Sequence, residues 1–396
     1  MGTEVGASNL IRHASNASLE PDVRLYALRA LERWNNPPQF DAVLGHHRPL
    51  DPSPFDLTIH SSKHASDFLT FLANEMNPEI ASLGTEVAKI LGISLNPKLL
   101  RQQVTDIDLD PQVRIASLQT LSELKVKRDD ELFLNLLNDP SEEVRAFVLN
   151  EGFVRGFDDI KTIAVEAVAE EALIVARQAI RNLVDSNVTQ LIEFWQNREL
   201  QVRPELWLDL YLALSSTDNP KAKQVAATYA AGDPSRVHAL SLSGGSPLAG
   251  DLVFRNQGAC MQCHQINGQG GVQGPELSLV GDRLHSDKLL ESLVNPSAEI
   301  TPGYGLSNFE LVSGSSLVGR LVEENEEMLT VITPDGKDHQ INENELVSIS
   351  PPISAMPALG LTLSPVDLRD LIAYLGSRNK KDLAQLRRLQ HGSKKQ

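Results

Sequence analysis

Cysteine is scarce in this sequence: there are two in 396 residues, and both lie in the stretch 260–264. A framework of disulfide bonds is therefore excluded. Long apolar runs are missing too, since no stretch approaches the roughly 18 to 20 residues that a membrane-spanning helix needs. Basic residues are outnumbered, with 36 Lys and Arg against 52 Asp and Glu and a net charge of −16. This balance argues against nucleic acid as a main partner, because phosphate binding needs clustered Lys and Arg.

The N-terminal segment 1–6 has neither the basic region nor the apolar region of a secretory signal. The overall composition, with 41% hydrophobic and 22% charged residues, is typical of a soluble globular protein. A chain of 396 residues is too long for one ordinary hydrophobic core. We therefore expect two domains, with room for a third small module.

A repeated phrase organises the first half of the chain. From about residue 19 to 231, apolar residues recur at the spacing of short amphipathic helices. The phrase stands at 20–24, 77–80, 110–114 and 139–145, with steps of 57, 33 and 31 residues between its aliphatic positions. Its Asp or Asn can cap a helix, its Pro fits the first turn, and a Val-Arg pair then opens the helix. The step is that of a two-helix unit, and the phrase resembles HEAT repeats, with an irregular helical bundle as the alternative.

Histidine and tryptophan in or near this region form no recognisable site. The histidines are His13, His46, His47, His60, His64 and His238. Their spacing matches no metal motif, so we expect ordinary solvated side chains. The tryptophans are expected to pack between helices rather than to bind a ligand. They are Trp34, Trp195 and Trp207.

Both cysteines belong to the motif Cys-x-x-Cys-His, which follows one short predicted helix at 248–258. This motif attaches haem because two thiols one helical turn apart reach the two vinyl groups, while the adjacent imidazole points at the iron. The sequence therefore predicts one covalent haem c. Cys260 and Cys263 would form the thioethers, and His264 would bind the iron.

Two other kinds of site use a Cys-x-x-Cys pair, namely zinc sites and redox dithiols. Zinc usually needs four ligands, and this chain could complete them only with distant histidines such as His285 or His339. A redox dithiol should follow a strand in a βαβ unit, whereas here a helix precedes the motif and a Gly-rich loop follows it. We favour haem over both alternatives.

The segment Gly-Pro-Glu-Leu at 274–277 begins ten residues after His264, where a mono-haem cytochrome needs a loop on the proximal side. The carbonyl of Pro275 is expected to accept the Nδ1 hydrogen of His264, which would fix the ring and make it a better ligand. A simple turn proline is the alternative. Leu277 and Tyr374 are expected to support the haem pocket.

Met356, in Ser-Ala-Met-Pro at 354–357, is the expected sixth ligand of the iron. A thioether is a soft ligand that favours ferrous iron and raises the reduction potential. A methionine that only fills the core is the alternative. The remaining methionines are the terminal Met1, Met76 in the repeats, Met261 between the cysteines and Met328 in a predicted strand.

A helix is predicted after this methionine, from Ser364 to Ser377, with Ser364 as N-cap and a proline in its first turn. We expect it to cross the helix that contains Phe254, with Tyr374 near the crossing. The small Gly250 would permit the two helices to approach closely.

Between the haem motif and Met356 the pattern changes to alternating strands, at 309–312, 317–322, 328–333 and about 340–341. Pro-Asp-Gly-Lys at 334–337 predicts a hairpin turn. We therefore expect a small β-hairpin insertion over about 307–350. Its glutamates at 323–327 are expected to form a solvated acidic loop, with partner docking or cation binding as the alternative.

Several motifs after residue 244 combine into a resemblance. They are Gly250-x3-Phe254, Cys260-x2-Cys263-His264, Gly274-Pro275-Glu276-Leu277, Gly281, the run 289–297, Gly303-Tyr304, Met356-Pro357 and the run 370–375. Together they resemble the haem-binding domain of planctomycetes and verrucomicrobia, often found at the C-terminus of large membrane-bound dehydrogenases. The resemblance covers about a third of the chain. A usual Asp-Gly turn is replaced here by Ser-Gly-Ser-Ser at 313–316.

The resemblance implies HEAT-like repeats before the haem domain and redox proteins as partners, with a dehydrogenase as donor and a respiratory acceptor. Many relatives also carry a propeller similar to quinoprotein dehydrogenases, and this chain has none. We therefore expect an electron carrier rather than an enzyme. The alternatives are a haem-based sensor, part of a larger quinoprotein-type dehydrogenase, and a structural repeat protein that binds no haem.

The expected architecture is mostly α: a HEAT-like α-solenoid over 1–240, a linker at Gly244-Gly245, and an α-helical cytochrome c domain over 245–396 that carries the β insertion. Covalent haem attachment is expected outside the cytoplasmic membrane. We therefore expect a periplasmic or otherwise exported protein, as a fragment of a longer chain or without its leader. The tail 380–396 has six Lys and Arg against one acid. It is expected to be a solvated helix end, with peripheral contact to an anionic membrane or partner as the alternative.

Overall fold

The computed structural model describes residues 4–34, 68, 70–72, 75, 77–93, 97–123, 129–233 and 235–382. The protein is mostly helical, as expected, and it also contains β-sheet. Its contacts divide it into two compact units, Met1–Ser186 and Asn187–Gln396. Among the described residues, no helix has the length and hydropathy to cross a membrane. The predictions for His46, His47, His60, His64, Met76 and the tail beyond residue 382 lie outside the described residues.

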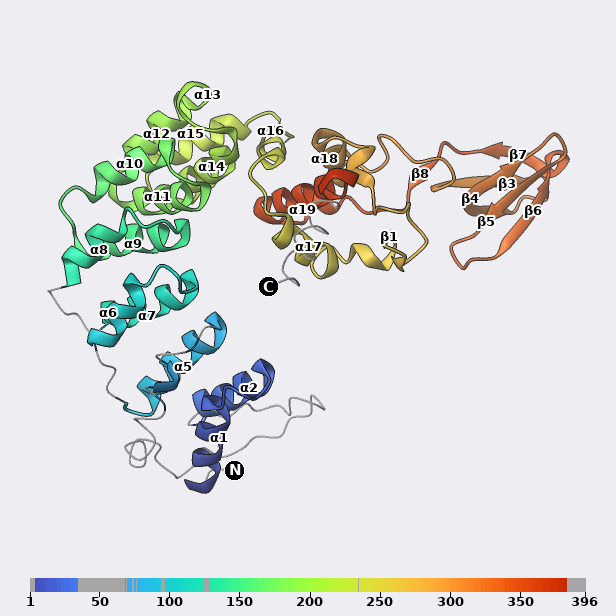
Figure 1. Ribbon diagram of the computed structural model, residues 1–396. Helices are drawn as coiled ribbons and strands as arrows, with labels where there is room; N and C mark the ends of the chain where they lie inside the picture. Colours follow the sequence, from blue (N-terminus) through green and yellow to red (C-terminus); the bar gives the residue numbers. More distant parts are fainter. Residues whose placement is uncertain are drawn as a thin grey trace. The chain divides into compact units, whose positions relative to one another are not determined.

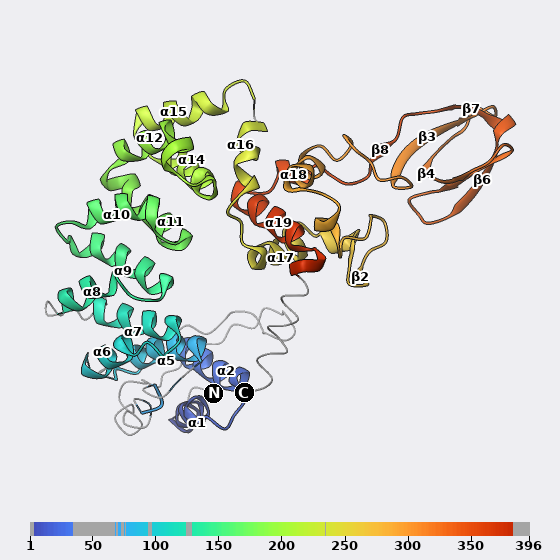
Figure 2. The ribbon, with the colours of Figure 1, turned by 45° about the horizontal axis from the view of Figure 1, so that its top comes forward.

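In its described ranges, the first unit consists of helices, most of which pack in pairs with their neighbours in the sequence (Figures 1 and 2). Its helices are α1 (Glu4–Ser15), α2 (Pro21–Glu32), α5 (Pro78–Ile90), α6 (Pro97–Thr105), α7 (Pro111–Glu123), α8 (Asp130–Leu136), α9 (Glu142–Arg155), α10 (Ile160–Glu170) and α11 (Leu173–Ser186). Helix α6 packs on α7, α8 on α9, and α10 on α11, while α7, α9 and α11 also pack on one another in order. The assignment of these pairs to a HEAT-like solenoid stays a prediction.

The repeated phrase begins a helix at each of its described copies. The Asn77 side chain accepts hydrogen bonds from the backbone N–H groups of Glu79 and Ile80, at 3.0 and 3.1 Å. At the start of α9 the cap is Ser141, whose hydroxyl accepts from Val144 N. Capping therefore works as predicted at Asn77, whereas in α9 the serine takes the role expected of Asp139.

The arginines of the phrase connect one helix pair to the next. Arg114 is 1% exposed. Its Nε donates to the carbonyl of Val104 at 2.9 Å, and its Nη1 donates to Asp139 at 3.0 Å. Arg24 makes the equivalent bond to the carbonyl of Ala14, at 3.1 Å, and pairs with Glu75. Each of these arginines therefore donates a hydrogen bond to a carbonyl near the end of one helix and also pairs with an acidic side chain that lies later in the sequence.

The second unit begins with five helices around an aromatic cluster. They are α12 (Val188–Gln196), α13 (Arg198–Gln201), α14 (Trp207–Ser216), α15 (Pro220–Ala230) and α16 (Ser235–Ala239). The Trp195 ring lies 4.9 Å from that of Tyr229, and the Arg198 guanidinium lies 4.5 Å from the Trp195 centroid. Trp195 and Trp34 are buried, which confirms that both pack between helices, and Trp207 is half-buried.

The predicted linker at residues 244–245 is packed rather than free. A Cβ on Gly245 would lie 2.4 Å from the Arg369 carbonyl oxygen. Ser246 N donates to the Asp370 side chain at 2.9 Å. Arg369 also forms a 2.9 Å ion pair with Asp209 of α14. The observed division at residue 186 thus differs from the predicted boundary at 240–245, and separate folding of the two predicted parts stays a prediction.

Helices α17 (Pro247–Arg255), α18 (Ser286–Val294) and α19 (Pro365–Ser377) form the helical part of the haem-motif region. Helices α17 and α19 cross in contact (Figures 1 and 2). A Cβ on Gly250 would lie 2.0 Å from the Asp370 carbonyl oxygen. The rings of Phe254 and Tyr374 are 5.5 Å apart. The predicted crossing is therefore confirmed, because only a glycine at position 250 permits this approach.

The insertion is a six-stranded antiparallel sheet, larger than the small hairpin insertion that we predicted. Its strands are β3 (Gly305–Leu311), β4 (Ser316–Glu324), β5 (Met328–Ile332), β6 (Asp338–Asn342), β7 (Leu346–Ile349) and β8 (Ile353–Ser354), in the order β6-β5-β4-β3-β7 with β8 also paired to β3. Phe309, Leu329, Val331 and Ile341 give it a core of its own. The sequence did not predict β7 and β8, because β7 follows acidic residues and β8 has only two residues after a pair of prolines.

Candidate functional site

The Cys-x-x-Cys-His motif forms a tight helical turn immediately after α17. Its first part is a 3-10 turn, η5 (Cys260–Gln262). Ala259 before it has a left-handed backbone with φ 46°. The backbone N–H groups of Cys263 and His264 both donate to the Cys260 carbonyl, at 3.1 and 2.9 Å. One turn of chain therefore presents two thiols and an imidazole together.

The two thiols of the motif have different environments. Neither is in a disulfide; Cys260 is buried and Cys263 is exposed. Burial raises the pKa of the Cys260 thiol to about 11, so this thiol is protonated at neutral pH. A reactive redox dithiol usually has a lowered pKa instead. The buried, protonated Cys260 thiol is therefore more typical of an anchoring cysteine than of the reactive cysteine of a disulfide oxidoreductase.

A Gly-rich loop wraps around the motif. It begins with a two-stranded hairpin, β1 (Gln265–Ile266) and β2 (Gln269–Gly270). Backbone hydrogen bonds then connect the loop to the motif, from Gly271 N to the Met261 carbonyl at 2.8 Å and from Gly274 N to the Cys263 carbonyl at 2.7 Å. The loop thereby holds the turn from its outer side.

The His264 ring has a defined orientation and tautomer. Its Nδ1 lies 2.8 Å from the carbonyl oxygen of Pro275, so the contact expected from the sequence is present. A carbonyl only accepts, so Nδ1 carries the hydrogen and Nε2 keeps its lone pair for a metal. Gly274 packs against the same ring, because a Cβ there would lie 2.5 Å from Cε1. The imidazole is thus held on two sides.

One hydrophobic cluster brings together the other predicted site residues. Cys260 and Tyr374 belong to its buried part, and Leu277 and Met356 are partly buried against it. Met328 lies in β5 of the sheet, and His339 lies in β6. His285 is exposed at the start of α18. Of the described methionines, Met356 and Met261 pack on this cluster, and Met261 lies between the two cysteines.

Asp251 and Arg255 are site residues that the sequence did not suggest. Burial alone would raise the pKa of Asp251, but hydrogen bonds from Arg255 and Tyr374 lower it. Burial and the Asp251 contact raise the pKa of Tyr374 to about 12. Arg255 also approaches the Met261 sulfur, at 3.4 Å. The two residues lie one helical turn apart on α17, and only the three-dimensional crossing with α19 reveals their polar contact with Tyr374.

The residues present fit haem better than they fit a metal ion alone. Within the described ranges, no three His, Cys, Asp or Glu side chains gather at a distance that could hold a metal ion. A zinc site would need such a group. Covalent haem instead needs two free thiols and one imidazole with an available nitrogen, and Cys260, Cys263 and His264 meet this requirement.

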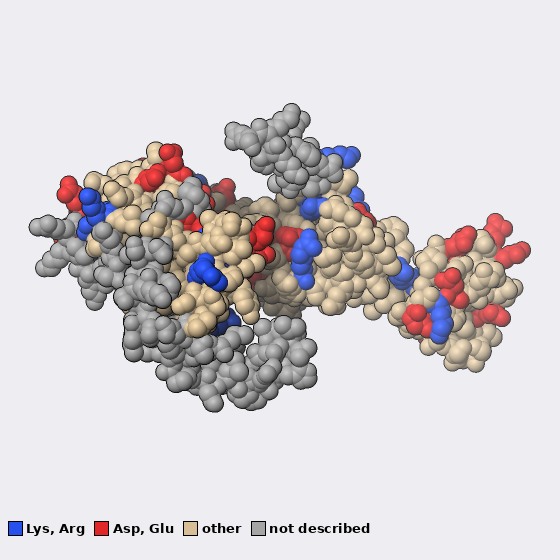
Figure 3. Space-filling model, turned by 60° about the horizontal axis from the view of Figure 1, so that its bottom comes forward, with Lys and Arg blue, Asp and Glu red and all other residues tan. Residues whose placement is uncertain are grey.

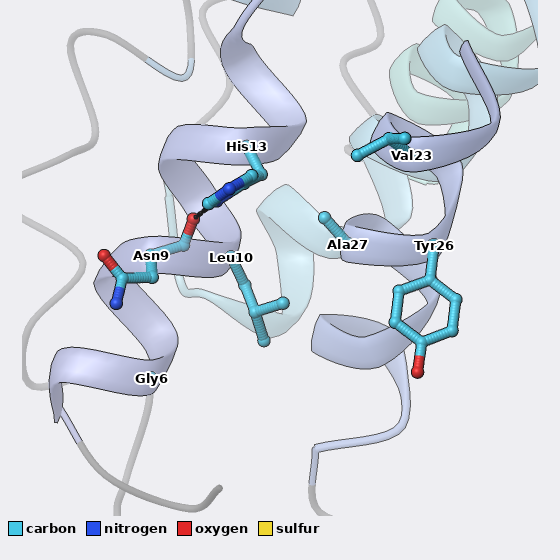
Figure 4. Close-up of a pocket in the computed structure, with 7 residues that line it drawn as sticks. All are labelled: Gly6, Asn9, Leu10, His13, Val23, Tyr26 and Ala27. Atoms are coloured by element: carbon cyan, nitrogen blue, oxygen red, sulfur yellow. Dashed lines mark hydrogen bonds between the residues drawn. The ribbon is translucent and has the colours of Figure 1, made fainter. Parts of the chain in front are cut away.

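A separate cavity of about 290 Å³ lies between α1 and α2 of the first unit (Figure 4). Its lining is almost entirely apolar. His13 is its one titratable imidazole, and the Nδ1 of this ring lies 2.6 Å from the carbonyl oxygen of Asn9 in its own helix. The cavity offers no thiol or carboxylate and is unrelated to the haem motif.

Comparison with known proteins finds a similarity around the haem motif. No curated protein matches the chain. The family model described as "Cytochrome c" matches residues 248–311. The match begins one residue inside α17, contains the Cys-x-x-Cys-His turn, the proximal loop, α18 and β3, and ends before Met356 and α19. Such a domain implies haem c and redox partners, and the match supports a haem-based electron-transfer role. Residues 248–311 are therefore similar to a cytochrome c domain, which supports a haem-binding role for this part of the chain.

Proposed function

We propose that this protein is an exported mono-haem c-type cytochrome that carries single electrons from a dehydrogenase to a respiratory acceptor. The observation that carries the proposal is the 2.8 Å contact between His264 Nδ1 and the Pro275 carbonyl, beside two free thiols. This contact leaves Nε2 of His264 for the iron. When bound, haem c supplies a one-electron Fe(III)/Fe(II) couple.

The residues of the chain have distinct tasks in this proposal. Cys260 and Cys263 hold the cofactor through thioethers, and His264 is the proximal ligand. Met356 is the sixth ligand, and its thioether favours the ferrous state and raises the potential. Leu277 and Tyr374 belong to the hydrophobic cluster around Cys260 and Met356, which excludes water from this side of the site.

The helical repeats act as a docking scaffold for a redox partner. Stacked helix pairs give a long surface, and buried arginines such as Arg114 connect one part of it to the next. The sheet offers another surface, and this one is acidic: more red acidic side chains than blue basic ones are visible on it (Figure 3). Its acidic residues are Glu310, Glu323, Glu324, Glu326, Glu327, Asp335, Asp338, Glu343 and Glu345, against Arg320 and Lys337. This charge favours a partner with a basic surface.

The domain is of the type found in planctomycetes and verrucomicrobia, preceded by HEAT-like repeats. The protein works in the periplasm or otherwise outside the cytoplasmic membrane, where covalent haem attachment takes place.

One experiment tests the proposal directly. The chain is expressed behind a signal peptide together with the haem-attachment machinery, and a denaturing gel is stained for haem. The expected result is a haem-positive band at the size of the chain, which disappears when both Cys260 and Cys263 are replaced by Ala. An unstained parent band would leave a structural repeat protein as the better reading.

A haem-based sensor is the second candidate function. Met356 is only partly buried, and Ala355 and Pro357 on either side are exposed. In a sensor, a loop of this kind would let Met356 leave the iron, so that a gas molecule binds in its place. Spectra in both oxidation states separate the two functions, because a carrier keeps Met356 on the iron in each state while a sensor exchanges it for carbon monoxide when reduced.

A further inference from the structure

The loop that carries Met356 is fixed at both ends. On its N-terminal side, β8 pairs with the start of β3, with Ser354 opposite Gly305. On its C-terminal side, the 3-10 turn η8 (Leu359–Leu361) packs on α18. A Cβ on Gly360 would lie 2.7 Å from a methyl group of Val294. Only residues 355–358 therefore lie between the two fixed points.

Two serine hydroxyls further attach the backbone of this loop to the rest of the domain. The Ser354 hydroxyl accepts a hydrogen bond from Met356 N at 3.2 Å. The backbone N–H of Ser354 in turn donates to the Ser297 hydroxyl at 3.1 Å. Ser297 follows α18 by three residues and lies 57 positions before Ser354. The hydroxyls thus connect the Met356 backbone to the chain segment that follows α18.

We propose that Ser354 and Ser297 are positioning residues that hold Met356 in place for the iron. This inference rests on the proposed function, in which Met356 is the sixth ligand. A ligand on a loop must be ordered before it can bind, and every contact that orders the loop in advance lowers this entropic cost. Without the two hydroxyls, Met356 should compete less well with external ligands.

Imidazole is the probe for this competition. It can bind the ferric iron only after Met356 has left, so its apparent dissociation constant reports how firmly Met356 is held. We compare the parent haem protein with Ser354→Ala, Ser297→Ala and Met356→Ala. A net hydrogen bond of ordinary strength predicts that Ser354→Ala binds imidazole about 2- to 10-fold more tightly than the parent. Ser297→Ala should change the affinity in the same direction.

Two matched variants separate positioning from general damage. Ser354→Thr keeps the hydroxyl and should restore the affinity of the parent. Ser292→Ala removes a hydroxyl that bonds only within α18, to the Lys288 carbonyl at 2.9 Å, and should leave imidazole binding unchanged. Amide hydrogen exchange gives an independent readout, because the Met356 N–H should exchange faster in Ser354→Ala than in the parent.

The outcomes distinguish this inference from the proposed function. If Met356→Ala binds imidazole no more tightly than the parent, Met356 is not the sixth ligand and the axial assignment fails. If Met356→Ala binds more tightly while Ser354→Ala and Ser297→Ala match the parent, Met356 is the ligand and the positioning role is overturned. A tighter complex in both serine variants, with recovery in Ser354→Thr, supports the inference.

Discussion

At the scale of single residues, the proximal half of the site was the most predictable part of the molecule. The motif at 260–264 is local in sequence, and a local motif needs only one turn of backbone to bring its groups together. The His264–Pro275 contact was also predictable, because the loop that makes it is only ten residues long. The ring contact of Gly274 was missed, since a sequence does not say which backbone atoms approach an imidazole.

The first prediction at this scale concerns Met356. Met356→Ala should leave haem attachment intact, because the thioethers are made by the two cysteines. It should abolish the weak far-red absorption of Met-ligated Fe(III), open the iron to carbon monoxide and lower the potential by on the order of 100 mV. Met328→Ala is the control and should do none of this, since Met328 lies in the sheet. An unchanged spectrum and potential in Met356→Ala would point to His285 or His339 instead.

The second residue-scale prediction concerns Gly274. Gly274→Ala places a methyl group 2.5 Å from Cε1 of His264, so the ring or the loop must move. We expect a loss of about 1 to 3 kcal/mol of unfolding free energy, together with a changed reduction potential. Gly376→Ala is the control, because a Cβ there meets nothing within 4 Å and alanine is the better helix former. Equal behaviour of the two variants in urea unfolding and potentiometry would contradict the role of Gly274.

At the scale of elements, helices with clear caps and strands with clear alternation were predictable, and so was the crossing of α17 with α19. The Gly250–Phe254 spacing on one helix and Tyr374 on the other indicated the contact before its geometry was known. Strands β7 and β8 could not be predicted, because they are short and gain their structure only by pairing with β3. The polar contact between Asp251 and Tyr374 at this crossing was also missed, because the two residues are far apart in the sequence and only the folded chain brings them together.

The Tyr374 hydroxyl gives the element-scale prediction, which concerns pH. Its pKa is raised from 10.0 to about 12 in the folded protein. The unfolded chain therefore loses this proton first, and the stability that Tyr374 contributes is fully present below pH 10 and disappears as the pH rises from 10 to about 12. Tyr374→Phe should remove this part of the alkaline destabilisation. Urea unfolding at pH 9 and pH 11 measures it, and an identical pH dependence in parent and variant would contradict the assignment.

At the scale of the whole molecule, the mostly helical content and a β insertion between the haem motif and Met356 were predictable from the sequence, whereas the HEAT-like assignment and the domain boundary at 240–245 stay predictions. Composition suggested a break at Gly244-Gly245, yet the contacts divide the chain after Ser186. Some of the contacts that keep residues 187–243 with the haem-motif region are polar and distant in sequence, such as Asp209 with Arg369, and others are apolar, such as Leu242 on the cluster around Cys260. Hydrophobic patterning does not register the polar contacts.

The buried arginines of the first unit give one prediction at this scale. Arg114→Ala leaves Asp139 buried without its partner, and we expect a loss of about 3 to 5 kcal/mol of unfolding free energy. Arg29→Ala breaks an exposed pair with Glu79 and should cost about 1 kcal/mol or less. Urea unfolding of both variants compares them. A cost for Arg114→Ala no larger than that for Arg29→Ala would show that the arginine contacts do not stabilise the array.

The boundary itself can be tested with fragments. Fragment 245–396 lacks Asp209 and the turn at Leu240–Leu242 that packs on α19, so we expect it to attach haem but to unfold at a lower temperature than fragment 187–396. Arg369→Met should reduce this difference in melting temperature, since it removes the charge that loses Asp209 as a partner. Equal melting temperatures of the two fragments would favour the boundary that composition suggested.

The pairing of β3 with β8 also bears on how the protein folds. His264 and Met356 are 92 positions apart, and closing so long a loop of unfolded chain is entropically costly and slow. The strands at the two ends of the insertion, however, lie side by side, with Leu306 opposite Ile353. Once the sheet has formed around its own core, residues 306 and 353 are held next to each other. The flexible chain that must close to bring His264 and Met356 together is then much shorter than 92 residues. The sheet would then shorten the search for the sixth ligand, and a variant with a weakened sheet core, such as Phe309→Ala, should reach Met ligation more slowly after refolding.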